Sequence, residues 1–210
     1  EQAIKAPIIK NVYGAEAPFT MLSWRYPGNS DQESDIAQIA GPILSNGMAG
    51  LIDIDLAQQQ KILRVGCFPY GRPDYGEMLL IGYPKEGQTL DQVKKLLLDE
   101  VDKLRKGDFD ENLIKATVNN IKLSDIRKME SNSGIAMAFV NSFINGTDWK
   151  RDVKMIDRLS KVTKQDIMAW ANKYMSAQSY ACVLKQIGED KNIKKISAPK
   201  ITPIVTNRDK

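Results

Sequence analysis

The sequence predicts an α+β fold, with a mainly antiparallel sheet and helices packed on one face. Strand-like segments at residues 61–68 and 77–83 follow each other across a short turn rich in Gly and Pro, which is typical of an antiparallel hairpin. Helical periodicity then dominates residues 89–175 and gives way to a last strand at 180–184. Helices and strands are therefore clustered rather than alternating, which favours one sheet covered on one side.

The chain is expected to begin with extended structure followed by a helix. Residues 1–14 are interpreted as an extended entry segment from a preceding domain, and residues 19–26, rich in aromatic and β-forming side chains, as a strand. The stretch Ser30-Asp31-Gln32-Glu33 has the pattern of a capping box and predicts a helix start. Pro42 is expected to interrupt or kink that helix, and Asn46-Gly47 to end it.

The segment between this helix and the hairpin is ambiguous. Residues 50–56 alternate as in a strand, but the glutamines at 58–60 favour a helix, and a short helix over 50–59 is the interpretation adopted. In the turn of the hairpin, Tyr70, Arg72 and Tyr75 could line a peptide groove. A purely structural turn is the favoured reading of the same residues.

A second capping box and a further cap mark the starts of two later helices. Thr89-Leu90-Asp91-Gln92 starts a helix that ends near Lys106-Gly107. The apolar positions Val93, Leu97, Val101 and Leu104 form its buried face. Thr163-Lys164-Gln165-Asp166 starts the last helix, and Thr147-Asp148 is expected to start a helix before it.

A long helical run is interrupted at Glu130-Ser131-Asn132-Ser133-Gly134. Ser, Asn and Gly are poor inside helices but good at their ends, so one helix is expected to stop here and another to begin. A Ser or Asn side chain should accept from the free N–H groups of the new helix, with Ser133 as the candidate cap.

Composition excludes several classes of function. The net charge is only +4, basic and acidic residues are interspersed, and the short basic stretch at 191–195 is interpreted as a solvated loop, so nucleic-acid binding is not expected. No segment approaches the roughly 18 apolar residues of a membrane span. Cys67 and Cys182 are interpreted as buried hydrophobic residues, and a disulfide between them is left open.

Catalytic motifs are absent from the sequence. The 210 residues contain no histidine, which excludes every His-based zinc motif and every Ser-His-Asp or Cys-His arrangement within them. The glycines form no phosphate-binding pattern. Asp53 with Asp55, and Asp108 with Asp110 and Glu111, could act as acid–base pairs or hold a hard cation. An amphipathic surface for the first group and a helix start for the second are favoured.

The order of these segments resembles the insulinase/pitrilysin family of zinc metallopeptidases, which includes mitochondrial processing peptidase. The resemblance covers roughly residues 15–188. It is carried by the Gly-rich corner at 47–51, the helix break at Glu130–Gly134, the helix start Val162-Thr163-Lys164-Gln165-Asp166-Ile167, and the helix end Tyr174-Met175. The resemblance implies the non-zinc-binding second domain of such a peptidase, with an α/β-roll fold.

The resemblance also implies where the chemistry lies. In that family a catalytic domain carries an inverted H-x-x-E-H motif, whose zinc ion activates water. A chain without histidine cannot hold this motif, so no cofactor is expected here, and zinc is expected in a preceding domain of the parent protein. Following domains, reached through a Pro-containing linker at 189–210, and a peptide substrate complete the implied partners. For a bacterial source, a periplasmic or secreted protein is compatible with the family.

One departure from the family concerns substrate binding. Active members often carry an Arg and a Tyr seven residues apart near the corner helix and the next strand, and here Ala57 and Arg64 occupy those positions. In such peptidases, repeated domains enclose the peptide in a chamber. The resemblance therefore implies a domain that forms part of the chamber wall and an inter-domain interface. The alternative is a structural or assembly module of the same fold without peptidase activity, like the core subunits of respiratory complexes. An independent basic binding protein is a third hypothesis.

Overall fold

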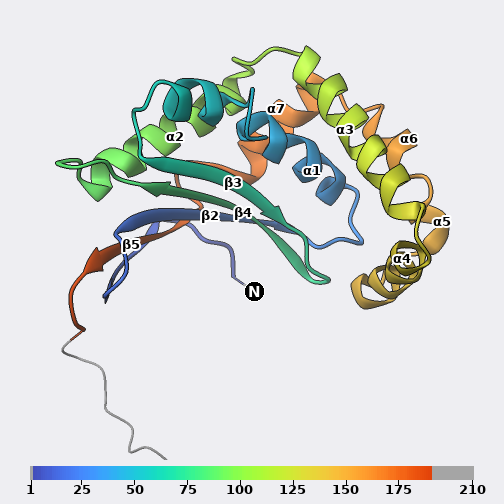
Figure 1. Ribbon diagram of the computed structural model, residues 1–210, viewed down its shortest axis with the longest axis horizontal. Coiled ribbons are helices and arrows are strands. Elements are labelled where there is room, and N and C mark those ends of the chain that lie inside the picture. Colours follow the sequence, from blue (N-terminus) through green and yellow to red (C-terminus); the bar gives the residue numbers. More distant parts are fainter. Residues whose placement is uncertain (1, 191–210) are drawn as a thin grey trace, which may run out of the picture.

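The structure, a computed structural model, describes residues 2–190 and contains one five-stranded sheet. Helices cover one face of this sheet (Figure 1). The strand order is β1-β5-β2-β4-β3, and every neighbouring pair is antiparallel except β1–β5. The strands are β1 (Ile8–Gly14), β2 (Phe19–Pro27), β3 (Arg64–Tyr70), β4 (Tyr75–Tyr83) and β5 (Ala181–Ile187). The predicted α+β class, with a mainly antiparallel sheet and helices on one face, is confirmed.

The helices differ widely in length. Two exceed four turns, and the segment at residues 53–58 is a π-helix, the wider variant of the helix. Within residues 2–190, none is both long and apolar enough to pass through a membrane. The helices are α1 (Glu33–Leu44), η1 (Asp53–Gln58), α2 (Leu90–Lys106), α3 (Asn112–Met129), α4 (Asn132–Asn145), α5 (Trp149–Asp152), α6 (Met155–Leu159) and α7 (Lys164–Tyr174).

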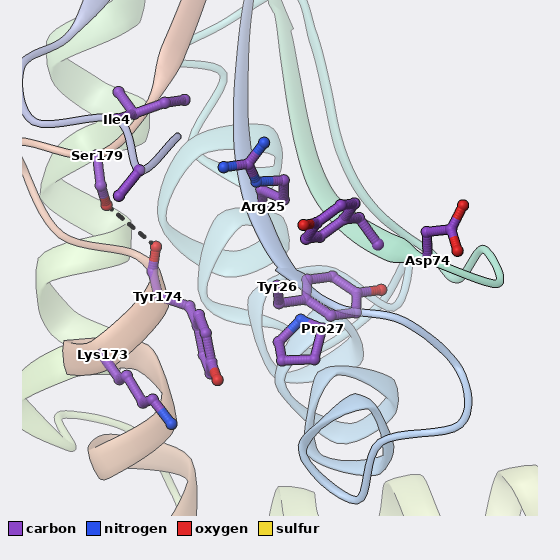
Figure 2. A pocket seen from close by; sticks show the side chains of 10 residues that line it. Ile4, Arg25, Tyr26, Pro27, Asp74, Lys173, Tyr174 and Ser179 are labelled. Carbon is purple, nitrogen blue, oxygen red and sulfur yellow. Dashed lines mark hydrogen bonds between the residues drawn. The ribbon is translucent and has the colours of Figure 1, made fainter. Parts of the chain in front are cut away.

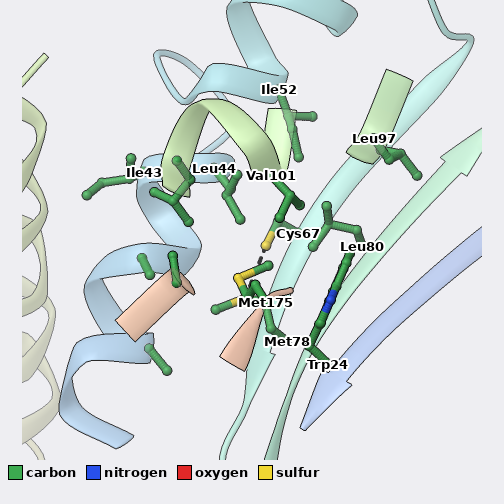
Figure 3. Packing of buried hydrophobic residues seen from close by; sticks show 14 of the residues in the cluster. Trp24, Ile43, Leu44, Ile52, Cys67, Met78, Leu80, Leu97, Val101 and Met175 are labelled. Atoms are coloured by element: carbon green, nitrogen blue, oxygen red, sulfur yellow. Dashed lines mark hydrogen bonds between the residues drawn. The ribbon is translucent and has the colours of Figure 1, made fainter. Parts of the chain in front are cut away.

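The core lies between the sheet and helices α1, α2 and α7 (Figure 3). In β2 every second residue is buried, because successive side chains of a strand point to opposite faces. Trp24 is fully buried, and its indole N–H donates to the carbonyl of Ser176 at 3.0 Å. The predicted apolar stripe of α2 packs onto the same face through Val93, Leu97, Val101 and Leu104, all buried.

Several local predictions are confirmed by geometry. Thr89 and Thr163 both accept from the backbone N–H three residues on, and both belong to complete capping boxes. Helix α2 ends at Gly107, whose φ of 74° is left-handed, a conformation that favours glycine. Cys67 and Cys182 are both buried and free, so the disulfide that the sequence left open is not formed.

The helix break at residues 130–134 is confirmed, but Ser133 is the wrong cap. Helix α3 stops at Met129, and α4 begins after Ser131, whose Oγ accepts from the Gly134 N–H at 3.0 Å. Ser131 has the extended backbone of a cap (φ −113°, ψ 143°), whereas Ser133 lies inside the first turn. Both serines satisfy the sequence pattern, and only the backbone geometry distinguishes them.

Other expectations need correction. The capping box at residues 30–33 is not formed, because Gln32 occupies the cap position and Asp31 Oδ1 accepts from the Glu33 N–H at 2.8 Å instead. Pro42 does not interrupt α1, which continues through it to Leu44. The helix expected after Asp148 is divided into α5 and α6.

The N-terminal segment is more ordered than an extended entry segment. Ile8–Gly14 forms β1 and pairs in parallel with β5, in a register that places Ile8 beside Ala181 and Gly14 beside Ile187. Contact with a strand about 170 residues away decides this pairing, which local patterning does not reveal. The basic stretch at 191–195 and most of the expected linker at 189–210 lie outside the described residues.

Candidate functional site

The acidic residues singled out in the sequence have structural partners. Asp53 is buried, and its carboxylate accepts from the Ser45 hydroxyl at 2.7 Å and from the N–H groups of Asn46, Met48 and Gly50 at 2.8–3.1 Å. This carboxylate therefore holds the corner between α1 and η1. Asp55 pairs with Lys103 of α2 at 2.7 Å.

The second acidic group marks a helix start, as favoured from sequence. Asp110 Oδ1 accepts from the Asn112 N–H at 2.9 Å, next to the first turn of α3. Across the described part of the chain, no group of three or more His, Cys, Asp or Glu side chains is placed to hold a metal ion.

Ala57 and Arg64 lie away from the hairpin turn. Ala57 is exposed on η1, and Arg64 begins β3 with its guanidinium 4.5 Å from the centroid of the Tyr83 ring. The turn that carries Arg72 is at the other end of β3. The structure thus keeps these two positions apart from the tyrosines of the turn.

A pocket of about 700 Å³ lies where β2 and β4 meet the end of α7 (Figure 2). Four segments that are distant in sequence contribute to it: the N-terminal segment, the end of β2, the start of β4 and the end of α7. Its volume lies within the usual range of ligand pockets, roughly 300–1,000 Å³. The lining residues are Ala3, Ile4, Arg25, Tyr26, Pro27, Asp74, Tyr75, Lys173, Tyr174 and Ser179.

We call this cavity the tyrosine pocket, and interactions on several sides hold its walls. The Arg25 guanidinium lies over the Tyr75 ring at 4.8 Å and donates to the carbonyl of Gln2 at 2.9 Å. Lys173 donates to the carboxylate of Glu33 at 2.8 Å, and the Tyr174 hydroxyl donates to the same carboxylate. The side chains are therefore pre-arranged, which lowers the entropy lost when a ligand binds.

The side chains of the tyrosine pocket offer aromatic stacking and hydrogen bonding. Tyr26 packs edge-on against Trp170 with ring centroids 5.5 Å apart. Burial, followed by the charge of Glu77, raises the pKa of Tyr26 to about 12, so its hydroxyl stays neutral at physiological pH. Aromatic rings and an arginine can stack on a peptide and donate to its carbonyls.

Only Tyr75 of the three turn residues proposed from sequence lines the pocket. Tyr70 stacks on Phe68 with ring centroids 6.2 Å apart, and Arg72 pairs with Glu77 at 3.6 Å. Sequence reasoning missed Arg25 and Tyr174. The available signal was Arg25 itself, a charged residue between two buried aromatic residues of one strand, which implies a second, accessible sheet face.

The face of the sheet opposite the helix layer is largely apolar, and we call it the open face. One row across the strands contains Lys10, Val183, Met21, Ile81 and Gly66. The next row contains Ile8, Ala181, Ser23, Leu79 and Phe68. Phe68 is 45% exposed and Ile8 46%. Because Arg25 and Tyr75 belong to this face as well, it continues into the tyrosine pocket.

A second cavity, of about 500 Å³, lies between α1, α3 and the α4–α6 region. Most of the residues that line it are polar, and they include the buried Asp35, whose carboxylate pairs with Arg158 at 2.7 Å. That hydrogen bond raises the pKa of Arg158, which therefore stays charged. Asn29, at the edge of the cavity, donates to Asn145 of α4 at 2.8 Å.

Comparisons with known proteins identify the fold. No family model matches the sequence, and no curated protein matches it significantly. Solved structures do match. A protease from Helicobacter pylori gives a TM-score of 0.81 at 15% identity, over 88% of this chain and 45% of that chain. A peptidase M16 inactive domain from Pseudomonas fluorescens gives 0.72 at 13% identity, over 86% and 43%.

A similar fold also occurs in a chain of a respiratory complex. A chain of Complex III from Candida albicans gives a TM-score of 0.65 at 10% identity, over 83% of this chain and 44% of that chain. This chain thus spans about half the length of these three structures, whereas it covers 92% of two other matched structures.

The chain has the fold of the insulinase-like, M16-type peptidase domains. Among its structural neighbours are domains that are themselves inactive, and the lack of histidine leaves this chain without the ligands of an H-x-x-E-H zinc site. The resemblance drawn from sequence motifs is confirmed at the level of the fold.

Proposed function

We propose that this chain is the non-catalytic domain of a zinc-dependent metalloendopeptidase, in which it forms chamber wall and an interface with the zinc-binding domain. Zinc and the activated water belong to that catalytic domain, and this chain contributes surface. The observation that carries the proposal is the apolar open face that continues into the tyrosine pocket.

The open face is suited to contact rather than to bulk water. An antiparallel sheet covered on one side usually carries polar residues on the other. Here Met21, Ile81 and Leu79 occupy the open side of the two central strands. A contiguous apolar area of this kind marks an interaction surface, because monomeric proteins rarely leave one exposed.

The tyrosine pocket is suited to an extended peptide. A peptide lying along the open face would reach Arg25 and Tyr75 at the end of β2 and the start of β4. Tyrosine rings bind side chains with little loss of conformational freedom, and a guanidinium donates several hydrogen bonds in one plane. Recognition would therefore combine stacking with contacts to main-chain carbonyls.

Steady-state kinetics on the parent peptidase tests this role. Tyr75→Ala should raise KM for peptide cleavage by roughly tenfold with kcat little changed. The lost contact binds the substrate equally in the ground state and the transition state, so the rate of the chemical step does not change. Tyr13→Ala is the matched control, since Tyr13 has similar exposure, lies outside the pocket and belongs to the other face of the sheet. Equal KM values for the two variants would rule out peptide binding in the pocket. Chelator-sensitive cleavage by this chain alone would contradict its non-catalytic role.

The Complex III match favours a second candidate function, a structural module without peptidase activity. The two candidates differ in what accompanies the domain. An H-x-x-E-H motif elsewhere in the polypeptide supports the peptidase, and a complete polypeptide without one supports the structural module. If this chain is a structural module, Tyr75→Ala should leave the assembly of its complex unchanged.

A further inference from the structure

The residues just before β1 lie at the tyrosine pocket without belonging to any helix or strand. We call residues 2–7 the pre-strand segment. Two of its residues, Ala3 and Ile4, form part of the pocket wall (Figure 2). The chain therefore places its own polypeptide at the site to which the proposed function assigns a peptide.

The pre-strand segment has few attachments. Within the part of the chain that the structure describes, one hydrogen bond holds it, from the Arg25 guanidinium to the main-chain carbonyl of Gln2 at 2.9 Å. Four of its residues are exposed, so little buried surface adds to this bond: Gln2, Ala3, Lys5 and Ala6. A segment held in this way can be displaced without disturbing the core.

The contact with Arg25 is not needed to hold the edge of the sheet. Strand β1 pairs with β5 along its whole length, from Ile8 beside Ala181 to Gly14 beside Ile187. The Ile8 N–H also donates to the Tyr180 carbonyl at 3.0 Å, which fixes the point where the pre-strand segment joins the sheet. The hydrogen bond from Arg25 is thus an additional contact, made at the pocket itself.

This contact is of the kind that a bound peptide requires. The group that Arg25 holds is a main-chain carbonyl, which every peptide carries whatever its sequence. The Tyr75 ring, with its centroid 4.8 Å from the guanidinium carbon, keeps the donor in place. A hydrogen bond from a charged donor is also stronger than one between neutral groups.

We propose that the pre-strand segment is the resident ligand of the tyrosine pocket, and that an incoming peptide displaces it and takes over the hydrogen bond from Arg25. The inference rests on the proposed function, which assigns a peptide to this pocket, and it adds the class of peptide. The bound carbonyl is followed by a small side chain and then an aliphatic one, as Ala3 and Ile4 follow Gln2.

The connection to β1 makes the pre-strand segment an effective competitor. Gln2 lies six residues before the anchored Ile8, so a detached segment stays near the pocket at an effective concentration of order millimolar. If the segment fills the pocket for about nine-tenths of the time, the apparent Kd of a competing peptide is about tenfold higher than its intrinsic Kd.

Limited trypsin digestion of the 210-residue chain tests the resident contact. Lys5 is exposed within the pre-strand segment, and cleavage after it follows the fraction of molecules in which the segment is detached. Arg25→Gln should raise the rate of this cleavage by roughly tenfold. Arg64→Gln is the matched control and should leave the rate unchanged, because Arg64 lies over the Tyr83 ring at 4.5 Å and outside the pocket.

Calorimetric titration tests the displacement. The probe is a hexapeptide with the sequence of residues 2–7, acetylated and amidated so that its ends carry no charge. A chain that lacks residues 1–4 should bind this probe with a Kd about tenfold lower than the full chain, because its pocket has no resident ligand. Arg25→Gln in the shortened chain should remove the gain, and Arg64→Gln should keep it. Circular dichroism confirms that each variant is folded.

Two results would overturn the proposal. One is an unchanged rate of cleavage after Lys5 in Arg25→Gln, or an equal increase in Arg64→Gln, since the segment is then not held at the pocket. The other is equal affinity of the full and shortened chains for the hexapeptide.

Failure of the proposed function gives a different pattern. A tenfold gain for the shortened chain, together with equal KM values for Tyr75→Ala and Tyr13→Ala in the parent peptidase, would support the resident ligand. The same pattern would contradict a role of the pocket in peptide cleavage.

Discussion

Helices α2 and α4 are amphipathic in opposite senses. In α2 the residues Val93, Leu97 and Leu104 are fully buried, and every charged residue except Glu100 is at least partly exposed. In α4 the residues that face the protein are small or polar, and Phe143 is 87% exposed. Both helices have apolar residues at helical spacing, but only α2 uses them in the core of its own domain.

The difference teaches that an apolar stripe identifies a surface to be covered and does not identify what covers it. In α2 the opposite face carries most of the helix's charged residues, so only one orientation against the sheet keeps those residues in contact with water. In α4 the buried residues are an alanine and a serine, with Asn145 beside them, and these polar groups are tolerated against the protein when their hydrogen bonds are satisfied. The packing of α4 is consequently set by its neighbours.

The largest expected effect is on the buried stripe of α2. Leu97→Ala should lower the free energy of unfolding by about 3 kcal/mol, because it removes buried methyl groups and leaves a cavity. The measurement is urea denaturation followed by circular dichroism. Phe143→Ala in α4, measured on dilute protein, is the matched change at an exposed position and should shift stability by less than about 0.5 kcal/mol. Similar losses in the two variants would show that the two helices are not opposite in packing.

The joint between α3 and α4 gives an intermediate effect. Ser131→Ala should cost about 1 kcal/mol, since the Gly134 N–H loses the side chain that accepts its hydrogen bond. Ser133→Ala is the control and should be close to neutral, because the Ser133 hydroxyl contacts only the Ser131 hydroxyl, at 3.3 Å. A larger loss for Ser133→Ala than for Ser131→Ala would contradict the cap assignment.

The buried face of α2 also contains a carboxyl group whose contribution to the stability of the fold depends on pH. Glu100 is 3% exposed, its Oε1 accepts from Lys103 at 2.9 Å, and its Oε2 has no hydrogen-bond partner among the described residues. Burial raises the pKa of Glu100, and the hydrogen bond from Lys103 opposes that rise without cancelling it.

A raised pKa means that the folded state holds this proton more tightly than the unfolded state. The contribution of Glu100 to stability is therefore fully present below the pKa of an unfolded Glu and is lost as pH rises through the folded pKa. Glu100→Gln should be more stable than the parent chain at neutral pH, and the difference should disappear in acid. Thermal unfolding across a pH series measures this, with the exposed Glu86→Gln as control. If the unfolding temperatures of the parent chain and of Glu100→Gln changed with pH in the same way, the raised pKa of Glu100 would be contradicted.

The tyrosine pocket shows why candidate sites are harder to derive from sequence than helices. Tyr75 stood out because it lies in a turn with two other conspicuous residues. Arg25 and Tyr174 belong to segments almost 150 residues apart, and nothing local links them. The register of β2 against β4, which places Arg25 opposite Glu77 and Pro27 opposite Tyr75, brings these segments to one end of the sheet.

The sequence by itself determined the features that depend on one turn of backbone. These include the capping box at Thr89, the cap at Thr163, the glycine at the end of α2, and the break between α3 and α4. In each case a side chain satisfies a backbone group within three or four residues. The absence of histidine, which excludes a zinc site of the H-x-x-E-H class in this chain, is likewise a property of sequence alone.

Only the tertiary structure decided that Ile8–Gly14 pairs with β5, and that the apolar side of α4 faces outward. The physical reason is that hydrogen bonds at helix ends are local, whereas strand pairing and helix orientation depend on surfaces contributed by residues far away in the chain. For α4, a helix without charge, local chemistry leaves the orientation open and the surrounding packing sets it.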